Sequence, residues 1–163
     1  MEKKGWVLID PGSAAGLDGT ISKASDSGEP WFGYYWNPTS MVGKYNLQPV
    51  DFGVPFAGRD NWDNCITLAE QDCANPKQTA WTKSEVNSIV SANFAKTGGK
   101  DVLKYVESRT FPGTVMNGML VYMAERQADG ADAAVEFLVR YPEVWSKWVP
   151  KSTADKIRKG IGL

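Results

Sequence analysis

Residues 31–36, which read Trp-Phe-Gly-Tyr-Tyr-Trp, constrain the fold more than any other segment. Aromatic residues favour extended backbone, and prolines at positions 30 and 38 delimit the run, so the pattern predicts a strand. Alternation along a strand would place Trp31, Gly33 and Tyr35 on one face and Phe32, Tyr34 and Trp36 on the other. Because both faces carry rings, this strand is expected to be covered on both sides.

The residues around this run predict a parallel strand–helix–strand unit. Residues 5–10 form a short apolar run that Asp-Pro-Gly closes, as at the end of a strand. Ser13 can cap a helix that continues to about Ser27, where Gly28 would end it. A further strand is predicted within residues 42–50, around 45–47. Short joints between strand, helix and strand are typical of a parallel βαβ unit.

Helical patterns dominate from residue 82 to the end. One helix is expected to open at 82–85, with Val86, Ile89, Val90 and Phe94 on its apolar face. Further helices are predicted over residues 101–108, 114–127, 131–140 and 142–148, and from 152 onward. Trp145 and Trp148 are expected to hold the last helices against the core.

Residues 51–81 are rich in Asp, Asn, Gly and Pro and contain both cysteines, Cys65 and Cys73. The chain has no histidine, so two cysteines alone do not make a zinc site, and their spacing differs from the redox Cys-x-x-Cys motif. We predict a disulfide that closes an exposed loop, and with it an oxidising compartment. The alternative is two unrelated thiols.

Composition excludes several classes of function. Eighteen Lys and Arg against 19 Asp and Glu give a net charge of −1, which argues against nucleic acid or an anionic membrane as the main partner. Without histidine the chain lacks the usual general base, and no nucleophile–base arrangement is visible. We therefore expect a protein that is not an enzyme, with no metal and no cofactor.

The chain contains seven Trp, six Tyr and six Phe. The negative faces of such rings attract a quaternary ammonium by cation–π contact. At the end of a parallel strand, where open α/β sheets bind ligands, the rings of residues 31–36 could form such a site. The alternative, which composition alone favours, is that they are core residues of a strand that is covered on both faces.

The sequence resembles the periplasmic glycine betaine/proline betaine/choline-binding proteins of ABC transporters. The segments that carry the resemblance are 28–39 (GEPWFGYYWNPT), 43–45 (GKY), 5–18 (GWVLIDPGSAAGLD), the Cys65/Cys73 loop, 80–86 (AWTKSEV) and 144–149 (VWSKWV). The resemblance implies two α/β lobes around a cleft in which an aromatic cage holds the trimethylammonium group. Trp36 matches the cage tryptophan, with Tyr35 and Tyr34 beside it as further ligand-binding candidates. An ABC transporter permease is the implied partner, and the implied location is periplasmic or extracytoplasmic.

Family members are longer, so this chain is interpreted as the C-terminal portion of such a protein, without a recognisable signal peptide. The fold class expected is α/β, type II periplasmic-binding-protein-like but partial: one βαβ unit plus a helical C-terminal half. Three segments are expected: 1–50 with the strand–helix–strand part of the ligand-binding lobe, 51–81 with the cysteine loop, and 82–163 with the helices. The competing interpretation is a self-associating interaction module, such as a homodimer, that binds no betaine.

Overall fold

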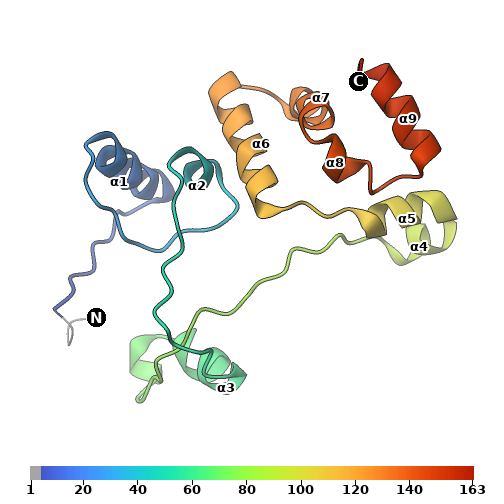
Figure 1. The fold of residues 1–163 in the computed structure, drawn as a ribbon. Coiled ribbons are helices and arrows are strands. Elements are labelled where there is room, and N and C mark those ends of the chain that lie inside the picture. Colours follow the sequence, from blue (N-terminus) through green and yellow to red (C-terminus); the bar gives the residue numbers. More distant parts are fainter. Residues whose placement is uncertain (1–4) are drawn as a thin grey trace. The chain divides into compact units, whose positions relative to one another are not determined.

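The computed structural model describes residues 5–163, and every regular element in that range is a helix (Figure 1). The α-helices are α1 (Ala14–Asp26), α2 (Ser40–Lys44), α3 (Arg59–Asn61), α4 (Ala92–Thr97), α5 (Lys100–Ser108), α6 (Gly113–Arg126), α7 (Gly130–Arg140), α8 (Pro142–Trp145) and α9 (Lys151–Gly160). A π-helical turn, η2 (Trp62–Ile66), and a 3-10 turn, η3 (Glu70–Asp72), complete the set. These residues form two compact units: one comprises the residues up to Gln48 together with Lys96–Leu163, and the other is Pro49–Ala95.

The three predicted strands are absent from the described part of the chain, so the α/β prediction is not confirmed. Residues 6–10 and 29–36 have no regular secondary structure. The third predicted strand is wrong because α2 occupies residues 40–44, and Asn46 then turns the chain with a φ of 49°. Extended backbone becomes a strand only when a neighbouring segment supplies ladder hydrogen bonds, and no described segment does so here.

Helix α1 begins and ends where its capping residues predict. The Ser13 hydroxyl accepts a hydrogen bond from the Gly16 amide at 3.0 Å, which satisfies one of the first unpaired N–H groups. Gly28 follows the helix with a φ of +68°, a conformation that glycine adopts without strain. Ile21 and Ala24 provide the buried face of the helix.

The predicted helices from residue 101 onward are confirmed as α5, α6, α7, α8 and α9, with bounds that differ by one to three residues. Local signals explain their ends. Asp129 and Asp132 form a reciprocal capping box at the start of α7, and Pro142 opens α8. Gln127 ends α6 in the left-handed conformation, with a φ of 51°.

The helix predicted to open at residues 82–85 is wrong over most of its length. Residues 82–91 are irregular, and only α4 at the end of the predicted segment is helical. Val86 is 98% exposed and Ile89 is 91% exposed, so the predicted apolar face has no partner. A short amphipathic helix with β-branched residues is marginal in water unless its apolar face packs against another element.

The core of the larger unit lies among α6, α7, α8 and α9. Its buried members are Val115, Met119, Phe137, Trp145, Trp148 and Ala154. The Trp148 ring stacks on Phe137 at 5.4 Å, and the Trp145 indole donates a hydrogen bond to the Leu138 carbonyl at 2.8 Å. The expectation that Trp145 and Trp148 hold the last helices is thereby confirmed.

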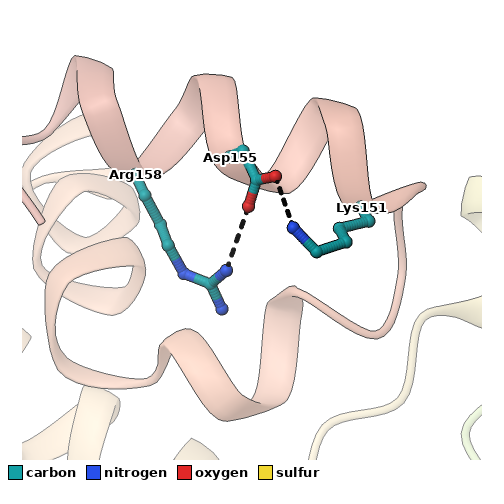
Figure 2. A network of polar contacts seen from close by, with 3 residues as sticks. All are labelled: Lys151, Asp155 and Arg158. Atoms are coloured by element: carbon teal, nitrogen blue, oxygen red, sulfur yellow. Dashed lines mark hydrogen bonds and ion pairs between the residues drawn. The ribbon is translucent and has the colours of Figure 1, made fainter.

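Helix α9 adds surface ion pairs to this apolar contact (Figure 2). The Lys151 ammonium donates to Asp155 at 2.8 Å, and Arg158 lies 3.6 Å from the other carboxylate oxygen. The hydrogen bond from Lys151 and the two nearby positive charges lower the pKa of Asp155. Exposed pairs of this kind contribute little to stability, so the burial of Ala154, 2% exposed, is the stronger anchor of α9.

The smaller unit, Pro49–Ala95, is organised around one disulfide and one asparagine. Cys65 and Cys73 are bonded, with their Cα atoms 4.8 Å apart. The buried Asn61 side chain accepts a hydrogen bond from the Lys77 amide at 3.0 Å and donates one to the Lys77 carbonyl at 3.2 Å. The Ala80 amide donates to the Pro55 carbonyl at 3.2 Å. Together with the buried Trp62, these contacts close a unit in which most of the large apolar side chains stay exposed.

Candidate functional site

The rings of residues 31–36, called the aromatic arm below, keep the predicted alternation without a sheet, whereas Gly33 is exposed. Trp31 and Tyr35 are half-buried, whereas Phe32, Tyr34 and Trp36 are 53%, 51% and 57% exposed. The prediction that both faces are covered is therefore wrong for this chain. One face of the arm lies on α1 and the other presents rings to solvent.

Helix α1 binds the inner face of the arm through two polar contacts. The Tyr35 hydroxyl donates a hydrogen bond of 2.5 Å to Asp18 Oδ1. The Trp31 indole donates to the Thr20 hydroxyl at 3.0 Å. Gly33 lies between them, and a Cβ at this position would come within 2.7 Å of the Trp31 ring. Glycine thus allows the indole to fold back over the arm.

Trp36, on the outer face, contacts Tyr34 on the same face and the ring of Tyr35 from the inner face. The Trp36 ring lies 5.5 Å from Tyr34 and 5.9 Å from Tyr35, with interplanar angles of 66° and 67°. Steeply inclined rings form a corner in which one cation can contact more than one ring face. The structure therefore brings together the three predicted ligand-binding residues, Tyr34, Tyr35 and Trp36.

Tyr35 remains a neutral phenol across the physiological range. Its burial, the hydrogen bond to Asp18 and the Asp18 charge raise the pKa of Tyr35 to about 12. A contact with Thr39 acts in the opposite direction. The negative charge beside the rings consequently belongs to the Asp18 carboxylate, and it favours a cationic ligand over a neutral one.

The turn after the arm is held by a residue from a distant part of the sequence. Asn117 of α6 accepts a hydrogen bond from the Thr39 amide at 2.9 Å and donates one to Asn37 Oδ1 at 3.0 Å. Sequence reasoning identified neither Asn117 nor Asp18. The sequence nevertheless marks Asn117 as unusual, because it is a polar residue between the apolar positions Val115 and Met119 of a predicted helix.

A separate groove of about 580 Å³ lies between α6 and α7 and contains none of the predicted site residues. Its charged lining is largely engaged within the protein. Arg140 forms an ion pair with Glu136 at 2.7 Å and lies over the Tyr122 ring at 5.9 Å. Asp132 belongs to the capping box of α7. We therefore place the candidate site at the aromatic arm.

The described residues contain neither a metal-binding cluster nor a membrane-spanning helix. Residues 5–163 contain no group of three or more His, Cys, Asp and Glu side chains that could hold a metal ion. No helix among them has the length and apolar character that crossing a bilayer requires.

Comparison with known proteins assigns the chain to a family. The family model for the substrate binding domain of ABC-type glycine betaine transport system matches residues 1–140. The chain belongs to this family, whose role is to bind substrate for ABC-type glycine betaine transport. The family has the type II periplasmic-binding fold, and its proteins are extracytoplasmic. Comparison with the curated proteins and with the solved structures found no match.

Proposed function

We propose that this chain contributes the aromatic arm to a binding site for quaternary amines such as glycine betaine, proline betaine or choline, and that it is not an enzyme. The observation that carries the proposal is the exposed Trp36 ring, inclined against Tyr34 and Tyr35. A trimethylammonium group has no N–H to donate, so ring faces and a nearby carboxylate are the chemistry that recognises it. The family's role in substrate binding supports the same ligand class.

The partner in this proposal is the permease of an ABC transporter, which the family context implies. The chain is expected to act as the C-terminal portion of the solute-binding component. Each cation–π contact contributes roughly 0.5–2 kcal/mol, and the loss of rigid-body freedom opposes binding. The arm alone should therefore bind glycine betaine at about millimolar affinity, equivalent to about −4 kcal/mol.

Titration with glycine betaine, followed by NMR of the protein, tests the proposal. The control ligand is 3,3-dimethylbutanoate, which has the same shape but a neutral carbon in place of the ammonium nitrogen. We expect saturable shifts with glycine betaine and none with the carbon analogue. Equal binding of both ligands would show that shape alone is recognised and would contradict a cation–π site.

A pair of tryptophan variants locates the site. Trp36→Ala should abolish the shifts because it removes the ring that both tyrosines contact. Trp81→Ala is the matched control, since Trp81 is 63% exposed but lies in the smaller unit. Binding that survives Trp36→Ala would place the ligand elsewhere on the chain.

A further inference from the structure

The ring cluster of Tyr34, Tyr35 and Trp36 is held at both ends by side chains of helices α1 and α6, which are distant from it in the sequence. Tyr35 is anchored to Asp18 of α1, as described above. Beyond Trp36, the Thr39 hydroxyl donates a hydrogen bond to the Trp36 carbonyl at 3.4 Å, and the Thr39 amide donates to Asn117 at 2.9 Å. Asn117 lies 78 residues from Thr39 and 80 residues from Asn37. The side-chain amide of Asn117 thus bonds to Asn37 and to Thr39, the two residues that flank Pro38.

Asn117 itself lies on a closely packed part of α6. It occupies α6 between Val115 and Met119, which are both buried in the core. On the same helix face, Gly43 of α2 approaches so closely that an added Cβ would lie 2.8 Å from Val121 Cγ2 and 3.0 Å from the Asn117 carbonyl oxygen. The backbone of Asn117 therefore cannot shift without disturbing both the core and the α2–α6 contact.

We propose that Asn117 is a positioning residue for Trp36: its side-chain amide fixes the turn at residues 37–39 and thereby holds the Trp36 ring beside Tyr34 and Tyr35. This proposal extends the proposed function of the arm. The hydrogen bonds of Asn117 on which it is based are present without a ligand. A binding group that is held in place before the ligand arrives loses less conformational freedom on binding. Asn117 would raise affinity in this way without contacting the ligand.

Substitution of Asn117 tests this role in full-length protein labelled with 5-fluorotryptophan and observed by ¹⁹F NMR. The Trp36 resonance is assigned from its loss in Trp36→Phe. In Asn117→Ala both hydrogen bonds to the turn are lost, so the Trp36 resonance should shift or broaden while those of Trp145 and Trp148 stay in place. In Asn117→Asp the acceptor for the Thr39 amide remains, and the Asn37 amide can rotate to donate, so this variant should restore the resonance.

Asn61→Ala is the matched control because the Asn61 side chain also makes two hydrogen bonds, both to the Lys77 backbone, but in the smaller unit. It should leave the Trp36 resonance unchanged. If Asn117→Ala does not fold, Asn37→Ala removes one of the two contacts from an exposed residue and should shift the same resonance less. A folded Asn117→Ala protein with an unchanged Trp36 resonance would overturn the proposal.

Ligand titration separates this proposal from the proposed function. If the unsubstituted protein binds glycine betaine, Asn117→Ala should weaken binding about three- to tenfold, and Asn117→Asp should recover most of it. If the unsubstituted protein binds no betaine, the proposed function fails, and the ¹⁹F spectra still decide whether Asn117 positions Trp36. Equal affinity in Asn117→Ala and the unsubstituted protein would count against the positioning role.

Discussion

Tyr35 shows how one hydrogen bond changes the chemistry of a whole ring cluster. Its hydroxyl donates to the Asp18 carboxylate, which fixes the ring against α1 and leaves its edge beside Trp36. A phenol that donates to a carboxylate resists ionisation, because the resulting phenolate would face a like charge. The cluster therefore keeps neutral rings and one adjacent carboxylate, the combination that suits a cationic ligand.

The Tyr35 hydroxyl is expected to ionise only at high pH. The ordinary tyrosine pKa is 10.0, and the folded protein raises the pKa of Tyr35 to about 12. A raised pKa means that the folded state holds its proton more tightly, so the contact stabilises the fold fully below pH 10 and loses this effect as pH rises toward 12. Absorbance at the tyrosinate band, with NMR assignment, should show Tyr35 ionising at higher pH than an ordinary tyrosine.

Replacement of Asp18 gives the matching test. Asp18→Asn removes the negative charge, so the pKa of Tyr35 should fall toward 10, while burial keeps part of the shift. Asp26→Asn, on the same helix, is the control and should leave the titration unchanged. If Tyr35 titrates identically in the unsubstituted protein and in Asp18→Asn, the hydrogen bond is not formed in solution.

At the scale of elements, the C-terminal helices are joined mainly by aromatic packing. Trp148 stacks on Phe137 at an interplanar angle of 16° and lies 4.8 Å from Phe111. It also meets Tyr105 of α5 at 6.4 Å, so one side chain contacts rings from several separate segments. Surface ion pairs such as those of α9 contribute little to the stability of the fold compared with this packing.

We accordingly predict that Trp148→Ala lowers the free energy of unfolding by about 3–5 kcal/mol, the range for removing a large aromatic residue from a core. Trp36→Ala is the comparison: Trp36 is 57% exposed, and surface substitutions usually change stability by less than about 0.5 kcal/mol. Urea unfolding followed by circular dichroism measures both. Similar losses in the two variants would mean that Trp148 is not the central packing residue.

At the scale of the whole molecule, apolar surface remains exposed near the start of the described chain. Val7, Leu8 and Ile9 are 84%, 76% and 79% exposed in a segment that forms no ladder with any other described segment. Such a segment can add to a strand of another chain. The exposed segment therefore favours association of the chain with itself, which does not bear on whether the aromatic arm binds a betaine.

We predict that the chain forms dimers through this segment at micromolar concentration, because identical chains most often close around a two-fold axis. Light scattering should give a mass above the 17.9 kDa of one chain. Leu8→Asp should return the protein to a monomer. Val86→Asp, at a residue 98% exposed in the smaller unit, should not. A mass of 17.9 kDa for the unsubstituted protein at every concentration would contradict self-association.

The sequence by itself determined the features whose causes lie within a few residues. Ser13 and Gly28 delimit α1, and Asp129 caps α7, because capping groups act on backbone atoms one to three positions away. The alternation of exposed and half-buried rings in the aromatic arm could also be predicted from the order of the residues. The three candidate ligand-binding residues are neighbours in sequence, so their proximity could also be predicted.

Only the tertiary structure decided the features that need a distant partner. Residues 31–36 have every local property of a strand but lack the neighbouring segment that would supply its hydrogen bonds. Residues 82–91 have a helical pattern but no surface on which to bury it. Asn117 reaches the turn at residues 37–39 because α6 packs against α2 at Gly43, a contact between segments more than 70 residues apart. Ladder pairing and side-chain packing depend on which segments meet, and local propensity does not carry that information.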